Sequence, residues 1–224
     1  METRLIGTDA EGIQLRILAH YLRNDDYVKA ITTGSKENKT DIHSVNRRAL
    51  GLNHITRDNS KTFIYAFILG AAIPRVSRIL KCSTSVASGC VSNFIDRTVG
   101  LRELREGQIR RDAQRGYFIG LDGRRVLQTS EHLMLAGYLQ NGESVIMKTA
   151  NLRWRRELKG MSIPFMQIND VHDEWVTEHT GELEEAEEIG KVQCEAIEWA
   201  GEELGLYCPL AGETKIGRNW AEVH

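Results

Sequence analysis

Three acidic residues stand where short extended segments end, and their side chains suit the binding of divalent cations. Asp9 closes the apolar run RLIGTDA, and Asp173 and Glu174 lie in VHDE within FMQINDVHDEWVTEH. An acidic pair in a turn is often only solvated charge. Two carboxylates on neighbouring strands, however, can hold hard divalent cations through oxygen while leaving coordination positions for phosphate. Two such ions about 3.5 to 4 Å apart would stabilise the attacking and leaving oxygens of a phosphoryl transfer.

A second group of residues could bind the phosphates. Arg57, Lys61 and Tyr65 are spaced by four within RDNSKTFIY, so on a helix each is rotated only about 40° from the one before and all three share a face. Two cations on one helical face suit a triphosphate, and an aromatic ring one turn further suits a sugar or a base. For this helix alone, an ordinary basic surface beside a buried tyrosine is the alternative.

The elements that must position these residues follow from hydrophobic periodicity and helix-end signals. Asp9 closes a predicted strand over residues 4–10. The other predicted elements are helices over 12–22, 41–51, 56–69, 131–151 and 182–204, a hairpin over 116–126 that turns at Asp122–Gly123, and a second hairpin over 165–179. Helical signals between Pro74 and Gln114 are weak. This mixture predicts an α/β (α+β) fold.

Composition limits the classes of protein. The 224 residues, 41% of them hydrophobic, suit a globular core, and the formal charge of −2 provides no overall basic field. The arginines between 102 and 125 face either solvent or a polyanion, and the acidic run from Gly181 suits a solvated helix. The four cysteines lack metal-ligand spacing, so buried thiols are expected. No apolar stretch approaches the roughly 20 residues of a membrane helix, so we expect a cytoplasmic protein with no membrane partner.

Together these stretches resemble family A (Pol I-type) DNA polymerases of the bacteriophage branch. DAEGIQLRILAHY resembles the first palm motif, RDNSKTFIYAFILGAA the fingers helix and VHDE the last palm motif. DIHSVN, GLDGRRV, LQNGESVIMK and NWAEVH also match, in the family's order. The resemblance implies a polymerase palm with an antiparallel sheet and an inserted helical fingers subdomain, with palm over 1–40, fingers over 41–115 and palm over 116–224.

The resemblance also implies a metal site. Asp9 and Asp173 match the two family carboxylates that bind the catalytic ions, expected to be two Mg²⁺. The backbone carbonyl of Ala10 should also reach a metal. Glu174 matches an assisting acid.

Further matches concern the incoming deoxynucleoside triphosphate. His43, Arg57 and Lys61 match groups that hold the triphosphate, and Lys61 is also the expected general acid toward pyrophosphate. Tyr65 matches the position beside the nucleotide sugar.

Other positions concern primer-template DNA or depart from the family pattern. Gln140 and His172 match contacts to the primer end. Gln14 stands where the family usually has a glutamate that crowds the 2′ position of the sugar, and it should still exclude ribose sterically. Leu69 replaces a tyrosine near the template base, and Ala136 replaces an asparagine of the minor-groove contact. These changes spare the metal site.

The implied activity is template-directed DNA synthesis, in which a primer 3′-hydroxyl attacks a dNTP and pyrophosphate leaves. Family members carry a thumb and usually an exonuclease domain before the first palm motif, so the sequence predicts the C-terminal piece of a split polymerase, with a separate chain supplying the thumb. If the source is a virus, the location is the host cytoplasm. The alternatives are a noncatalytic DNA-binding or assembly remnant and a metal-dependent hydrolase.

Overall fold

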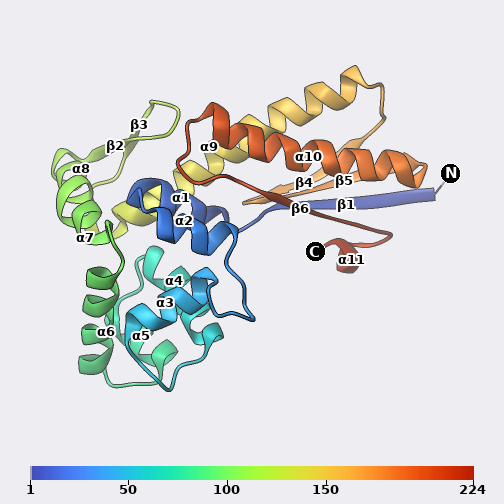
Figure 1. Cartoon of the computed structure of the whole chain (residues 1–224). Coiled ribbons are helices and arrows are strands. Elements are labelled where there is room, and N and C mark those ends of the chain that lie inside the picture. The colour runs from blue at the N-terminus through green and yellow to red at the C-terminus, as the bar shows by residue number, and fades with distance from the viewer. Residues whose placement is uncertain (1) are drawn as a thin grey trace. The chain divides into compact units, whose positions relative to one another are not determined.

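The computed structural model describes residues 2–224 and divides them into two compact units (Figure 1). The first unit contains the described residues up to Ile17 and the segment Asn141–His224, and the second contains Leu18–Gln140. Both divisions fall inside helices, namely α1 (Ile13–Leu22) and α9 (Glu131–Gly160). The three subdomain ranges predicted from the sequence stay a prediction.

A four-stranded antiparallel sheet forms the basis of the first unit, in the order β4-β5-β1-β6. Its strands are β1 (Glu2–Ala10), β4 (Met166–Val171), β5 (Glu174–Gly181) and β6 (Gly212–Gly217). The long helix α10 (Leu183–Glu203), the short helix α11 (Trp220–Val223) and the adjoining parts of α1 and α9 complete the unit. The first strand of the chain is therefore an interior strand, paired on both sides.

The two faces of β1 differ in what covers them. Ile6 and Thr8 point to the face that α10 covers, where the Thr8 hydroxyl donates to Gln193 Oε1 at 2.6 Å. Gly7 points to the other face, where an added Cβ would collide with the backbone of Val223 in α11. Because side chains alternate along a strand, Asp9 shares this second face with Gly7.

The second unit is mainly helical. Its elements, besides the adjoining parts of α1 and α9, are α2 (Asp25–Thr32), α3 (Ile42–Leu50), α4 (Arg57–Ile68), α5 (Ile73–Leu80), α6 (Thr84–Arg97), α7 (Leu101–Glu103), a π-helical turn (Leu104–Ile109), α8 (Arg110–Arg115) and the hairpin β2 (Tyr117–Ile119)–β3 (Arg125–Leu127). The rings of Phe63, Phe67 and Phe94 pack with centroids 5.2–5.7 Å apart and anchor α4 to α6.

Local end signals explain why α3 and α4 begin and end where the sequence predicts. Asp41 caps α3 by accepting from the His43 amide, and Gly51 closes the helix in the left-handed conformation at φ 74°. Thr56 and Asn59 form a reciprocal capping box at the start of α4. Both helices carry residues expected to bind the nucleotide.

The predicted fold class is confirmed, with two corrections to its elements. The helix expected over 131–151 continues to Gly160, because its polar second half packs Trp154 against Trp175 of β5, with ring centroids 5.8 Å apart. Helix α2 and strand β6 were not predicted. Strand β6 is short and is stabilised by pairing with β1, far away in the sequence, so local periodicity gives no signal for it.

Two further expectations concern the cysteines and membranes. All four cysteines are free thiols; Cys90 and Cys208 are buried as expected, whereas Cys82 and Cys194 are partly exposed. Within residues 2–224, no helix is both long enough and apolar enough to cross a membrane.

Candidate active site

Carboxylates from three strands gather around the end of β1 in the first unit. Asp9 lies opposite Glu174 in the β1–β5 ladder and opposite Glu213 in the β1–β6 ladder. Residues opposite each other in neighbouring strands point to the same face of a sheet. The sheet therefore presents a row of three acidic side chains on the face away from α10.

The fourth acidic residue, Asp173, is brought to this place by the β4–β5 turn. The Ala10 amide donates to the Asp173 carbonyl oxygen at 2.8 Å, which ties the turn to the end of β1. His172, the other turn residue, has φ 56°, the left-handed conformation that glycine adopts more readily. The predicted second hairpin is confirmed, with His172 and Asp173 at its tip and Glu174 as the first residue of β5.

The clustered negative charge changes the acidity of Asp9. Partial burial raises its pKa to about 6, together with the charges of Asp173, Glu174 and Glu213, while Lys215 acts in the opposite direction. A hollow of about 240 Å³ opens beside these groups; its lining includes Asp9, Glu174, Glu213, Lys215 and His224. Anionic charge of this density favours the binding of a cation.

The oxygen-rich lining fits a divalent cation that is shared with a substrate. Within residues 2–224, no three His, Cys, Asp or Glu side chains form a preassembled metal site. Mg²⁺ typically takes only one or two protein carboxylates and completes its octahedral shell with water and substrate phosphates. Asp9 and Asp173 provide two hard oxygen donors of this kind, so the residues present fit the ion.

Three residues at this hollow were missed by sequence reasoning. Glu213 and Lys215 lie on the unpredicted strand β6, and no sequence motif points to them. His224 belongs to the terminal motif NWAEVH, which gave no sign of its role, and its Nδ1 lies 2.8 Å from Glu174 Oε2. The pairing of β6 with β1 brings the first two residues to Asp9.

Arg16 is a further missed residue, and it braces the loop that follows Asp9 and Ala10. Its buried guanidinium donates to the Glu11 carbonyl at 2.7 Å, to the Glu11 carboxylate at 2.5 Å and to the Pro209 carbonyl at 2.6 Å. These three charge-assisted hydrogen bonds tie Glu11, the residue that follows β1, to the segment at Pro209.

Gln14 belongs to a small polar group in the same unit. Its Nε2 donates to Glu143 Oε2 at 2.9 Å, and His172 Nδ1 lies 3.9 Å from Glu143 Oε1. Burial raises the pKa of Glu143, while the hydrogen bond from Gln14 lowers it and the charge of Asp173 raises it further. Glu143 was missed from the sequence because a glutamate inside a long helix usually faces solvent.

The second unit holds the predicted triphosphate-binding residues together. Arg57 Nε donates to Asp41 Oδ1 at 2.8 Å, and Asp41 also accepts from the hydroxyl of Ser44 at 2.5 Å. Partial burial acts to raise the pKa of Asp41, but the hydrogen bonds from Arg57 and Ser44 keep it below its usual value. Asp41 thus links the start of α3 to the start of α4.

His43 lies near the cationic side chains of Arg57 and Lys61. Burial lowers its pKa to about 4, and the charges of Arg57 and Lys61 act in the same direction. Its ring is 6.3 Å from the ring of Tyr65, and its buried Nδ1 makes no hydrogen bond within residues 2–224. The imidazole is therefore neutral at pH 7 and offers a polar atom to a ligand.

The remaining predicted positions differ in exposure. Lys61 is exposed on α4 and makes no ion pair with any described residue. Leu69 is exposed at the end of α4, Ala136 is buried, and Gln140 is exposed. The predicted site residues therefore form two groups, the metal-binding set with Gln14 and His172 in the first unit and the nucleotide set with Gln140 in the second.

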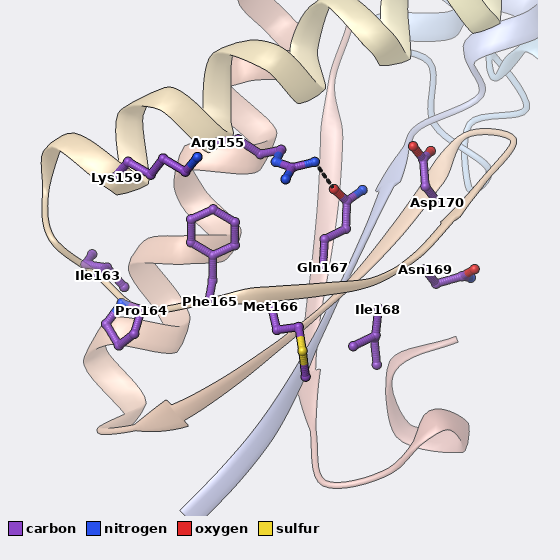
Figure 2. Close-up of a pocket in the computed structure, with 10 residues that line it drawn as sticks. All are labelled: Arg155, Lys159, Ile163, Pro164, Phe165, Met166, Gln167, Ile168, Asn169 and Asp170. Carbon is purple, nitrogen blue, oxygen red and sulfur yellow. Dashed lines mark hydrogen bonds between the residues drawn. The ribbon is translucent and has the colours of Figure 1, made fainter.

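A second hollow of the first unit does not involve the carboxylate cluster. Figure 2 shows the residues that line this groove beside the edge strand β4. The volume of the groove is about 640 Å³. Arg155 donates to Gln167 at 3.3 Å, Lys159 extends from the same helix, and Asp170 is the only acidic residue among the described residues of the lining. One carboxylate offers less for phosphoryl chemistry than the row at Asp9.

Comparison with known proteins identifies what the chain is similar to. The family model of DNA polymerase family A matches residues 1–222. The DNA-directed DNA polymerase of Enterobacteria phage T3 is 33% identical over 242 residues, covering 97% of this chain and 33% of that protein. The enzyme of the same name from Escherichia phage T7 is 32% identical with the same coverage. DNA polymerase I of Mycobacterium leprae is 27% identical over 97% of this chain and 25% of its own length.

A solved structure has the same fold. It is described as the POL domain of Pol1 from M. smegmatis in complex with DNA primer-template and dNTP, and it superposes with a TM-score of 0.82 at 23% identity. The match covers 98% of this chain and 40% of that one. The chain thus spans about a third of the length of the phage relatives.

Proposed function

Because the chain belongs to DNA polymerase family A, we propose that it carries the nucleotidyl-transfer site of a template-directed DNA polymerase. The observation that supports this most strongly is the acidic row at the end of β1, where Asp9 lies opposite both Glu174 and Glu213 beside Asp173. The proposed substrates are dNTPs and primer-template DNA, the ligands named for the M. smegmatis structure.

The first unit would provide the metal-binding part of the reaction. Asp9, Asp173 and the carbonyl of Ala10 would hold two Mg²⁺ ions, which when bound stabilise charge on the attacking and leaving oxygens. Glu174 assists from β5, where His224 fixes its carboxylate. Gln14 would lie beside the nucleotide sugar, and His172 beside the primer end.

The second unit would provide the triphosphate-binding part. Arg57 and Lys61 offer two cations on one face of α4, and neutral His43 adds a hydrogen-bonding group. Tyr65 would lie against the sugar and Gln140 against the primer. Phosphoryl transfer depends mainly on positioning and electrostatic stabilisation, so these residues need little covalent chemistry.

The reaction we propose is attack of the primer 3′-oxygen on the α-phosphorus of the dNTP. The 3′-hydroxyl would lose its proton to water as the new bond forms, the bond from the α-phosphorus to the bridging oxygen would break, and pyrophosphate would leave with a proton supplied by Lys61. The charge that develops on pyrophosphate is met by Arg57 and Lys61.

Primer extension tests this function. Asp9→Asn and Asp173→Asn should each remove extension of a labelled primer, while Glu187→Gln, on the exposed side of α10, should extend like the wild type. DNA binding without extension by the wild type would support the noncatalytic remnant instead. Release of phosphate from dNTP without primer or template would support the hydrolase.

We also propose that efficient synthesis needs the parts of the polymerase that the relatives have and this chain does not span. Fewer phosphate contacts mean weaker binding of DNA. A separate chain that carries a thumb and exonuclease stays a prediction. It is tested by extension assays of this chain alone and mixed with the neighbouring gene product; equal activity in the two assays would contradict it.

A further inference from the structure

Glu143 carries a buried carboxylate that does not serve the stability of the fold. Glu143 lies on α9, and the residue is only 7% exposed. No Lys or Arg of residues 2–224 forms an ion pair with it, and its hydrogen bond comes from the Gln14 amide at 2.9 Å. Burying a carboxylate without a cation is costly, and an apolar residue of similar size would stabilise α9 better.

The bond to Glu143 determines how the Gln14 carboxamide is oriented. An ionised carboxylate only accepts hydrogen bonds, so the NH₂ group of Gln14 must face it. The other end of the carboxamide, Oε1, is fully enclosed and makes no hydrogen bond within residues 2–224. Among residues 2–224, the hydrogen bond to Glu143 is therefore the one directional interaction that holds this side chain in place.

The pair lies next to residues of the acidic cluster. Gln14 follows Asp9 by five positions, and the charge of Asp173 acts on Glu143. The ring of His172, in the same turn as Asp173, lies 3.9 Å from the other oxygen of Glu143. A substitution of Glu143 therefore changes the surroundings of the proposed metal site without altering any proposed metal ligand.

We propose that Glu143 is a positioning residue that locks the Gln14 carboxamide beside the sugar of the incoming nucleotide and thereby sets discrimination against ribose. The inference rests on the proposed function. A glutamine that is free to rotate moves away from a 2′-hydroxyl, whereas a glutamine held at its amide end cannot, so steric rejection depends on the hydrogen bond.

The sharpest test exchanges the amide of Gln14 and the carboxylate of Glu143 between the two positions. Glu143→Leu removes the acceptor, and Gln14→Glu places two carboxylates against each other. The double variant Gln14→Glu/Glu143→Gln restores one amide and one carboxylate in reversed positions. Glu157→Gln, a partly exposed glutamate on the same helix, is the matched control.

The measurements are kcat and KM for dATP and ATP in primer extension, with the affinity for each nucleotide from competition against a fluorescent nucleotide without primer. Glu143→Leu should raise the ratio of ATP to dATP efficiency about tenfold with kcat for dATP nearly unchanged. Gln14→Glu should impair use of both nucleotides, and the double variant should recover the wild-type ratio. The control should not change it.

Two results would overturn the inference alone. One is an unchanged ratio in Glu143→Leu, and the other is an equal loss of dATP and ATP use in that variant without recovery by the exchange, as expected of a purely structural role. A wild-type protein that neither binds nor incorporates dATP would instead overturn the proposed function, and this inference with it.

Discussion

Asp9 lies directly opposite Glu174 across the β1–β5 ladder, so two carboxylates share one face of the sheet next to the β4–β5 turn. Like charges in opposite positions of neighbouring strands destabilise a sheet. This repulsion is useful where a cation binds, because the ion relieves it.

Asp9→Asn should stabilise the metal-free protein while it removes nucleotide addition. The expected gain is up to about 1 kcal/mol in the free energy of unfolding, limited by solvent screening of an exposed side chain. Urea denaturation in the presence of a chelator measures the gain, with Glu187→Gln as the control. A less stable Asp9→Asn protein would show that Asp9 holds the fold together and does not strain it.

Asp41→Ala should weaken both the fold and the binding of dNTP. The variant loses the cap of α3 and frees Arg57, which together should cost about 1–2 kcal/mol of unfolding free energy. The KM for dNTP should rise because Arg57 is no longer held.

The matched control for loss of the Asp41–Arg57 contact is Asp58→Ala. Asp58 is exposed on α4 and lies 3.9 Å from Arg57, so its loss should change the unfolding free energy by no more than about 0.5 kcal/mol. Equal effects of the two substitutions, measured by urea denaturation and steady-state kinetics, would argue against a special role for Asp41.

His43 should make stability depend on pH in the acidic range. Its folded-state pKa of about 4 is below its unfolded value of 6.5, so the unfolded state takes up a proton first as the pH falls. This contribution is fully present above pH 6.5 and is lost as the pH falls toward 4.

The comparison with His43→Gln isolates this effect from other titrating groups. Between pH 7 and pH 5 the wild type should lose on the order of 1 kcal/mol more than the variant. Parallel stability curves for the two proteins, measured by urea denaturation, would mean that the folded protein accepts a proton on His43 as easily as the unfolded chain does.

His172→Gly should stabilise the hairpin, because glycine adopts φ 56° without strain. We expect a gain of about 0.5 kcal/mol in unfolding free energy, together with weaker primer extension. His172→Ala removes the same ring but keeps the strained backbone, so it should weaken extension without the gain. Equal melting temperatures for the Gly and Ala variants would exclude strain at this position.

Local sequence determined the elements that carry most of the proposed site. The cap at Asp41, the capping box at Thr56 and the alternation in the second hairpin are short-range signals, and the structure has the predicted elements at these places. The carboxylates of Asp9 and Asp173 and the cations on α4 also indicated phosphoryl chemistry from their residue types and local spacing alone. Each of these signals depends only on residues within a few positions of one another in the chain.

Only the tertiary structure decided which residues from distant parts of the sequence lie beside these predicted site residues. Glu213 and Lys215 reach Asp9 because β6 pairs with β1, and Glu143 meets Gln14 across 129 positions of sequence. Such contacts depend on register between segments and on burial, and neither leaves a periodic pattern in the chain. A glutamate in a helix looks like a solvated charge until the packing around it shows that it holds another side chain.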